Sequence, residues 1–328
     1  MKNKTEINEY VVLARKYRPQ TFESLIGQET LVKTLTNSIT QNRIAHAYLL
    51  TGVRGIGKTT TARLIAMSLN CENRHSDSCE PCGKCESCVS IREDRNLDVI
   101  EMDAASKTGV DDIREIIDNV KYRPVNCKYK IFIIDEVHML SKQAFNALLK
   151  TLEEPPNYLK FIFATTEVRK IPVTVLSRCQ RFDLVRIKSD LLLKFLKKIT
   201  IQEKGKISED ALKLIVKISE GSVRDSLSLL DRALIISGAE KKELNLDSAQ
   251  KIFGYFNKSH LIELLKSIFE GKEEATLIKF RNLADTGIDP KIFLNDFLEI
   301  IYLMKNIKIF NEKEITFAMS DAEINSIK

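Results

Sequence analysis

The sequence contains no long hydrophobic run. No apolar stretch in its 328 residues approaches the roughly 18 residues that a membrane-spanning helix needs. The first residues, MKNKTEINEYVVLARKYRP, also lack the apolar segment of a secretory signal peptide. We therefore expect a cytoplasmic protein with no membrane partner. In that compartment thiols stay reduced, so clustered cysteines favour a metal site over disulfides.

The sequence also has little excess charge, and it has neither internal repeats nor a low-complexity linker. Lys and Arg number 51 against 45 Asp and Glu, which leaves a net charge of +6. This surplus permits contact with nucleic acid without requiring it. With 44% hydrophobic and 29% charged residues, the composition is that of a globular protein. On a prior of roughly 150 residues per domain, the length suggests about two domains.

Short apolar runs alternate with longer amphipathic segments over the first 186 residues. The apolar runs have the pattern of buried strands at residues 47–52, 98–104, 130–136, 160–166 and 180–187. The longer segments have helical spacing at residues 58–69, 110–121 and 141–152. Continuous apolar strands that alternate with helices are typical of a parallel sheet covered on both faces. The pattern therefore predicts an α/β fold.

From residue 188 onward the strand pattern ends. Leucines and isoleucines recur three and four residues apart, with Gly205 and Gly221 as breaks. This spacing predicts a small helical bundle. A second helical block follows the polar stretch SGAEKKELNLDSA.

A glycine-rich segment, GVRGIGKTT, fits the phosphate-loop pattern G-x-x-x-x-G-K-[ST]. It follows a predicted strand and opens a predicted helix, which is the context that the motif requires. The candidate nucleotide-binding residues are Gly52, Val53, Arg54, Gly55, Ile56, Gly57, Lys58, Thr59 and Thr60. Backbone N–H groups of the glycines would turn toward the phosphates. Lys58 would hold the β- and γ-phosphates, and the Thr59 hydroxyl would ligate Mg²⁺. The alternative is a chance glycine-rich turn.

A second motif, IFIIDEVH, places two carboxylates at the end of a buried strand. Asp135 and Glu136 would emerge at the carboxyl edge of the sheet, where α/β proteins bind ligands. Asp135 would orient Mg²⁺ or its water. Glu136 would polarise the water that attacks the terminal phosphate, although it could also be an ordinary surface carboxylate. Together the two motifs predict a nucleoside triphosphatase.

Five cysteines lie close together in the sequence. CEPCGKCESC (79–88) holds four of them, three residues apart, and Cys71 stands upstream. Because a tetrahedral zinc site takes four ligands, one thiol is in excess, and the spacing alone does not say which. Four thiolates leave no open position, so they indicate a structural rather than a catalytic metal site. We expect it to staple a small protrusion; free thiols are the alternative.

Six segments extend these motifs along residues 10–235. They are LARKYRPQTFESLIGQE, AHAYLLTGVRGIGKTTTARLIA, DAASKTGVDDIRE, IDEVHMLSKQAFNALLKTLEEPP, FATTEVRKIPVTVLSRC and GSVRDSLSLLD. Together they closely resemble the ATPase subunits of the bacterial DNA polymerase III clamp loader, the gamma/tau family of the AAA+ superfamily. The resemblance is weaker after residue 250. It implies an AAA+ ATPase domain over 1–187 with a zinc module at about 71–88. A three-helix lid would cover 188–246, and a helical collar for oligomerisation would cover 247–328.

The resemblance also implies site residues. Arg178, in the triplet SRC, resembles the arginine finger that reaches the ATP of a neighbouring subunit, a task that suits a permanently charged bidentate donor. Arg224, in GSVRD, resembles the second sensor, which touches the γ-phosphate of its own subunit. Thr166 resembles the first sensor and is favoured over Thr165. If the resemblance is set aside, the simpler interpretation is that both arginines are surface residues or ion-pair partners of carboxylates.

For the zinc module, the family pattern is a cysteine that closes LNC, followed by C-x-x-C-x-x-C. The implied zinc ligands are Cys71, Cys82, Cys85 and Cys88, with Cys79 as the extra thiol. The spacer after Cys71 is longer than the family's usual one. An exchange of Cys71 for Cys79 therefore stays open, and His75 is a weaker candidate.

The implied cofactors are ATP, Mg²⁺ and Zn²⁺, and the implied mechanism is a switch. A ring of copies of this chain with delta and delta prime subunits, held by ATP, would open the sliding (beta) clamp. Primer–template DNA would trigger hydrolysis and release the clamp. DNA contact should be independent of sequence. Lys107 and Lys150 match DNA-facing positions, although Gly109 replaces a residue that is often basic in the family. A solvated helix face is the alternative for both lysines.

Two other functions compete with this interpretation. One is a non-hydrolysing scaffold subunit of a similar ring, which the intact phosphate loop and acidic pair disfavour. The other is a related DNA-acting motor such as a branch-migration helicase, which should lack the cysteine module. Nothing in the sequence resembles a polymerase active site. No segment resembles the polymerase- and helicase-binding tail of the longer family form, which leaves open whether this is a natural short form.

Overall fold

A computed structural model describes residues 10–75, 77–106, 109–240, 243–253, 258–285 and 290–306. The chain divides into two compact units, one up to Glu243 and one from Leu244. Each unit is described by itself.

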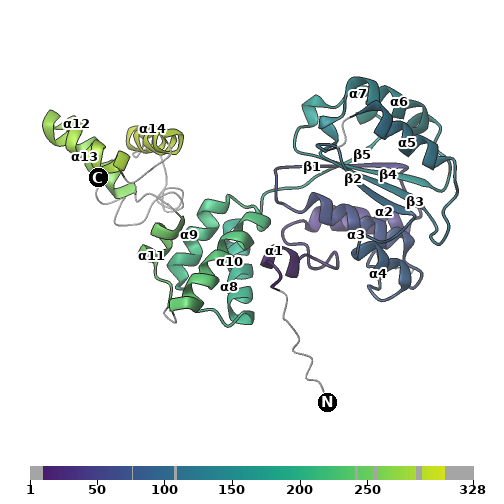
Figure 1. The fold of residues 1–328 in the computed structure, drawn as a ribbon, viewed down its shortest axis with the longest axis horizontal. Coiled ribbons are helices and arrows are strands. Elements are labelled where there is room, and N and C mark those ends of the chain that lie inside the picture. Colours follow the sequence, from purple (N-terminus) through teal and green to yellow (C-terminus); the bar gives the residue numbers. More distant parts are fainter. Residues whose placement is uncertain are drawn as a thin grey trace, which may run out of the picture. The chain divides into compact units, whose positions relative to one another are not determined.

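The first unit is built on a five-stranded parallel sheet with the strand order β2-β3-β4-β1-β5 (Figure 1). The strands are β1 Ala47–Thr51, β2 Val99–Asp103, β3 Lys130–Asp135, β4 Leu159–Thr165 and β5 Gln180–Asp183. The strands β1 to β4 coincide with predicted strand segments to within one residue at each end, whereas β5 covers only residues 180–183 of the predicted segment 180–187. The predicted α/β fold with a parallel sheet is therefore confirmed. Asp103 at the end of β2 pairs in register with Asp135 at the end of β3.

Helices cover both faces of the sheet, as Figure 1 shows. One face carries α2 Glu29–Thr40, α3 Lys58–Asn70 and α4 Glu86–Arg92; the other carries α5 Val110–Val120, α6 Lys142–Glu153 and α7 Val173–Leu176. Because successive strand residues point to opposite faces, Tyr48 and Leu50 join the core under α2 and α3, whereas Ala47 and Leu49 join the core under α5 and α6. Burial on both faces explains why β1, β3 and β4 are almost continuously apolar.

A helical bundle completes the first unit. It consists of α8 Ser189–Gln202, α9 Glu209–Ser219 and α10 Val223–Glu240, against which the short α1 Leu13–Lys16 packs. Ser208 caps α9 by accepting a hydrogen bond from the Ala211 N–H. Gly221 joins α9 to α10 with a φ of +81°, and a side chain there would meet the Ile187 carbonyl at 2.9 Å. The predicted break at Gly221 is therefore a turn that requires glycine.

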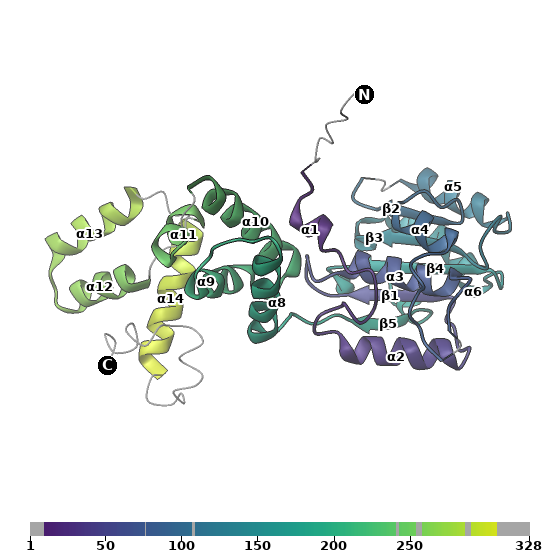
Figure 2. The same cartoon turned by 90° about the horizontal axis from the view of Figure 1, so that it is seen from below.

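The second unit is helical, as the sequence predicted. Its described helices are α11 Leu246–Phe253, α12 Lys258–Phe269, α13 Glu273–Asp285 and α14 Pro290–Asn306, of which α12 and α13 lie side by side (Figure 2). Phe293 of α14 stacks on Phe297 and meets the edge of Phe280 of α13. None of the helices formed by the described residues is both long enough and apolar enough to cross a membrane.

Candidate functional site

The glycine-rich loop joins β1 to α3, as its motif requires. Gly57 takes a φ of +99° at the N-cap of α3, so the chain turns sharply and the first N–H groups of the helix face the loop. Gly55 lies against the bundle: a side chain there would come within 2.1 Å of the Ser222 hydroxyl. The backbone N–H of Arg224 donates to the Gly55 carbonyl at 3.1 Å. The start of α10 is therefore bonded directly to the phosphate loop.

Lys58 and Thr59 point from the start of α3 toward the end of β3. The Lys58 ammonium is buried and donates to the carbonyls of Gly52 and Val53, both at 3.1 Å. Burial lowers the pKa of Lys58, and the nearby carboxylates of Glu136 and Asp135 oppose that shift. The Thr59 hydroxyl donates to Asp135 Oδ2 at 2.5 Å. Two oxygen ligands suited to a hard cation thus lie side by side.

Glu136 follows Asp135 in a left-handed conformation, with φ and ψ both 44°. Such a conformation costs about 1–3 kcal/mol in a residue with a side chain and is concentrated at functional sites. Its carboxylate oxygen Oε2 accepts from the Thr166 hydroxyl at 3.1 Å and from the Thr166 N–H at 3.3 Å. Thr165 is fully buried and instead contacts His138. Of the two threonines, Thr166 is therefore the one bonded to Glu136.

A cleft of about 1330 Å³ opens over the phosphate loop. Its walls come from residues of the segment 12–26, the loop itself, both carboxylates of the acidic pair and the start of α10. The basic residues that line it are Arg15, Arg18, Arg54, Lys58, Arg63, Arg92 and Arg224. They outnumber the acidic residues of the lining, so the cleft favours an anionic ligand. The wall formed by the segment 12–26 was not assigned to the site from the sequence.

Other predicted residues lie away from this cleft. Arg178 pairs with Glu153 at 2.5 Å and donates to the Thr174 carbonyl at 2.6 Å, and it is not among the described residues that line the cleft. Lys150 is exposed in the last turn of α6. Lys107 lies outside the described residues.

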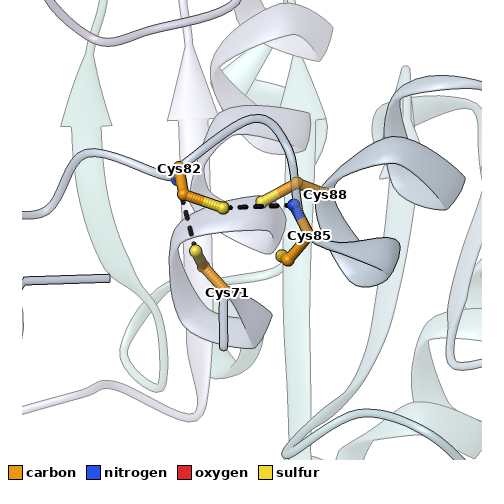
Figure 3. Close-up of side chains that lie close together, drawn as sticks. All are labelled: Cys71, Cys82, Cys85 and Cys88. Atoms are coloured by element: carbon orange, nitrogen blue, oxygen red, sulfur yellow. Dashed lines mark hydrogen bonds between the residues drawn. The ribbon is translucent and has the colours of Figure 1, made fainter. Parts of the chain in front are cut away.

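Four cysteines form a second candidate site. The sulfur atoms of Cys71, Cys82, Cys85 and Cys88 all lie within 4.8 Å of one another (Figure 3). Cys71 follows the end of α3, and Cys85 and Cys88 come from the start of α4. The Cys85 N–H donates to the Cys82 sulfur at 3.2 Å, and the Cys82 N–H donates to the Cys71 sulfur at 3.2 Å. Backbone donors, chiefly the N–H groups of Lys84 and Cys85, lower the pKa of Cys82 to about 6.

The fifth thiol is outside this group. Cys79 is buried, and its sulfur contacts the Thr36 hydroxyl of α2 at 3.0 Å. His75 is likewise not part of the cluster found among the described residues. The folded chain thus gathers the set that contains Cys71, and four sulfur ligands at this separation are compatible with zinc.

The cysteine module is not the small protrusion that the sequence suggested. Cys79, Cys85 and Cys88 belong to the same buried cluster as Phe22 and the apolar side chains of α3. The carboxylate of Glu80 accepts the backbone N–H groups of Phe22 and Glu23, both at 2.9 Å. Because Phe22 lies between Thr21 and Ser24, which line the cleft, the module is connected to the wall of the cleft. Sequence spacing gave no signal for this contact.

The architecture defines a class of protein. A parallel sheet with a phosphate loop after β1, an acidic pair after β3 and a helical bundle bonded to the loop is an AAA+ P-loop ATPase fold. Two solved structures share it: the Holliday junction branch migration motor RuvB of Thermotoga maritima and a single-residue variant of that motor. Each aligns with a TM-score of 0.54 over 77% of this chain and 80% of that chain, at 21% identity for the motor and 20% for the variant. At that identity, the likeness shows the fold alone.

Family models match three successive segments of the chain. Residues 27–188 match the model described as DNA polymerase III, delta subunit. Residues 193–239 match the ATPase lid domain of a DNA polymerase III clamp loader subunit. Residues 244–328 match domain III of the DNA polymerase III subunits gamma and tau.

Curated relatives cover most of the chain. It is 44% identical to the DNA polymerase III subunit gamma of Buchnera aphidicola subsp. Schizaphis graminum, over 92% of this chain and 83% of that protein. It is 45% identical to the subunit tau of Bacillus subtilis, over 88% of this chain and 50% of that protein. For the subunit tau/gamma of Haemophilus influenzae, 41% identity spans 93% of this chain and 44% of that protein. The chain belongs to the DNA polymerase III gamma/tau family, and it spans about half the length of these tau-type relatives.

Proposed function

We propose that this chain is an ATP-hydrolysing subunit of the DNA polymerase III clamp loader. It would use ATP binding and hydrolysis to load a sliding clamp onto primer–template DNA. The observation that carries the proposal is the convergence of Lys58, Thr59, Asp135 and Glu136 on one basic cleft, in a chain of this family. If the chain were a different motor with the same fold, the cleft would be explained, but the similarity to gamma and tau subunits would not.

Lys58 would bind the β- and γ-phosphates of ATP. Its ammonium already donates to two carbonyls of the loop, so it is directed into the ring of backbone groups that would surround the phosphates. Thr59 and Asp135 would hold Mg²⁺, which when bound supplies positive charge against the phosphate oxygens. The surrounding arginines add to that charge.

Glu136 would orient and polarise the attacking water. Phosphoryl transfer to water depends on positioning and charge stabilisation more than on covalent chemistry, so the direction of this carboxylate matters. Thr166 holds one of its oxygens through two hydrogen bonds. This contact supports the assignment of Thr166 as the first sensor.

The two predicted arginines would act on different nucleotides. Arg224 lines the cleft of its own chain, which supports a contact with the γ-phosphate from the start of α10. Arg178 is bonded to Glu153 and is directed elsewhere, which supports an action on the ATP of a neighbouring subunit. Such an arginine can raise hydrolysis by about 10³-fold or more.

The four-cysteine cluster would hold a structural zinc ion. Cys71, Cys82, Cys85 and Cys88 supply a full tetrahedral set and leave no position for a substrate. The metal would fix the start of α4 to the end of α3, which follows the phosphate loop. We assign it no part in hydrolysis.

The proposed domain organisation follows the sequence analysis. Residues 1–187 would form the ATPase domain, 188–246 the lid and 247–328 the collar. The partners would be delta and delta prime subunits, further copies of this chain, the beta clamp and primer–template DNA. Lys107 and Lys150 remain candidates for contacts with the DNA backbone, which would lose affinity as salt rises.

The scaffold alternative is tested by one assay. The purified chain, assembled with its partner subunits, should release phosphate from ATP and load clamps on primed DNA. Glu136→Gln should still bind ATP but lower hydrolysis by about 10²-fold or more, because the amide cannot polarise water as a carboxylate does. Glu115→Gln makes the same change at an exposed carboxylate of α5, which is not among the described residues that line the cleft, and serves as the matched control. A wild-type assembly that binds ATP and clamp but never hydrolyses would favour the scaffold function.

A further inference from the structure

His138 is a buried polar residue next to the catalytic carboxylate, and the mechanism above gives it no task. It lies in the 3-10 helix Val137–Met139, directly after Glu136, and its side chain is only 6% exposed. Both of its ring nitrogens face polar side chains. Nδ1 lies 3.0 Å from the Thr165 hydroxyl and 3.4 Å from Glu136 Oε2, and Nε2 lies 3.5 Å from Glu167 Oε1.

The contact with Glu136 falls on an oxygen that is already engaged. Oε2 of Glu136 is the atom that accepts both hydrogen bonds from Thr166. The Glu136 backbone turns into the 3-10 helix, where the Met139 N–H donates to the Glu136 carbonyl at 2.9 Å. This turn brings the imidazole back against the carboxylate. Thr166 therefore holds this oxygen through hydrogen bonds from the residue after β4, and the His138 ring lies against the same oxygen from the 3-10 helix.

The opposite edge of the ring faces the segment that carries Arg178. Glu167 donates its N–H to Thr165 Oγ1 at 3.0 Å and forms an ion pair with Lys170 at 2.8 Å. It begins a second 3-10 helix, Val168–Lys170, which leads into α7 and then to Arg178. A ring that is protonated on both nitrogens can donate toward Glu136 and Glu167 at once. In that form His138 is a side-chain bridge between the carboxylate that would activate water and the start of this segment.

We propose that His138 is a positioning residue for ATP hydrolysis, which holds the Glu136 carboxylate and couples it to the segment 167–178 through Glu167. The proposal rests on the proposed ATPase function. When a neighbouring subunit engages Arg178, a shift of this segment would reach Glu136 of the same chain through the imidazole. The position of Glu136 in each subunit would then depend on whether Arg178 of the same subunit is engaged with the neighbouring subunit.

Three substitutions separate positioning from simple filling of space. His138→Leu keeps an apolar side chain of similar volume and removes both polar contacts. In His138→Asn the amide nitrogen can take the place of Nδ1 and keep the contacts with Glu136 and Thr165, but it cannot reach Glu167. In His138→Gln the longer side chain can reach Glu167 but does not reproduce Nδ1.

The measurements are kcat for phosphate release and the dissociation constant of a fluorescent ATP analogue, in the full chain assembled with its partners. Misplacement of a reacting group by about 1 Å can cost 10²-fold, so we expect kcat of His138→Leu to fall by about tenfold to 100-fold. Nucleotide affinity should change by less than about twofold, because no contact to the phosphates is lost. His138→Asn should recover part of the basal rate, and more of it than His138→Gln recovers.

The coupling is tested by stimulation with clamp and primed DNA. His138→Asn and Glu167→Gln should each lower the stimulated rate more than the basal rate. Combined, they should lower it by less than the product of the single effects, because both break one bridge. Additive effects would overturn the coupling to Glu167.

The remaining outcomes distinguish failure of the positioning role from failure of the ATPase mechanism. If His138→Leu keeps kcat within about twofold of wild type while Glu136→Gln is inactive, His138 only fills space and the proposal fails. If Glu136→Gln hydrolyses ATP at the wild-type rate, the proposed ATPase mechanism fails instead. Thermal unfolding of each variant identifies loss of folding. If His138→Leu unfolds, the comparison of His138→Asn with His138→Gln decides the positioning, and equal rates for these two would refute it.

Discussion

The four-cysteine cluster supports a quantitative prediction, because the chain carries its own control. Cys88 and Cys79 are both buried, 1% and 2% exposed, and both belong to the core beneath α3. Cys88 lies inside the proposed metal cluster, whereas Cys79 lies outside it and contacts Thr36. Cys88→Ser and Cys79→Ser therefore make the same chemical change in the same core, and only one of them removes a proposed zinc ligand.

The expected magnitudes differ for that reason. In Cys79→Ser the new hydroxyl retains Thr36 as a hydrogen-bond partner, so we expect a loss of about 1–2 kcal/mol in the free energy of unfolding. Cys88→Ser suffers a similar burial cost and also loses the metal. Structural zinc contributes about 10–16 kcal/mol to the folding of isolated zinc peptides. Since this module also packs on the main core, we expect a smaller additional loss, of about 3–5 kcal/mol.

Metal analysis and thermal unfolding measure both effects. Wild type and Cys79→Ser should carry about one zinc per chain, and Cys88→Ser should carry little. At about 2–4 °C per kcal/mol for a unit of this size, the additional loss lowers the Tm of Cys88→Ser by at least about 6 °C relative to Cys79→Ser. A strong chelator should lower the Tm of wild type and Cys79→Ser toward that of Cys88→Ser and leave Cys88→Ser unchanged. Equal zinc loss in both variants, or wild type without zinc, would refute the assignment.

Three further predictions concern other parts of the chain. Lys58→Ala should abolish ATP-dependent clamp loading because the phosphate contact is lost; loading at the normal rate would contradict the phosphate-loop assignment. Arg178→Ala should keep ATP affinity but lose stimulated hydrolysis, and an assembly that mixes it with Lys58→Ala should regain some activity at interfaces with an intact loop and an intact arginine. No recovery in any mixture, with assembly intact, would exclude action on the neighbour. Asp98 is 2% exposed and accepts the N–H groups of residues 125–127. Asp98→Asn should therefore lower the free energy of unfolding by about 3 kcal/mol in denaturant titrations. A change below about 1 kcal/mol would show that these hydrogen bonds do not stabilise the fold.

The family and the nucleotide motif were determined by the sequence alone. The phosphate loop and the acidic pair are short segments whose function depends on residues next to one another, and their strand and helix context follows from local periodicity. The strands β1, β3 and β4 were predicted for the same reason: they are largely apolar, because helices cover both sides of the sheet. The comparisons with gamma and tau subunits confirm the family resemblance.

Only the tertiary structure decided which side chains meet. Five neighbouring cysteines allow more than one set of four, and the choice of Cys71 over Cys79 depends on where α3 ends relative to the start of α4. Neighbouring threonines cannot be told apart from the sequence alone. In the fold, Thr165 ends β4 and contacts His138, whereas Thr166 follows the strand and is bonded to Glu136.

The same holds for contacts between distant segments. Glu80 meets the backbone of Phe22 and Glu23, and His138 meets Glu167, across separations in the chain that no local pattern spans. These contacts exist because helices and loops from different parts of the chain pack on a shared sheet, and packing is a property of the whole unit. The sequence determined which chemical groups the protein carries, and the fold decided which of them lie together.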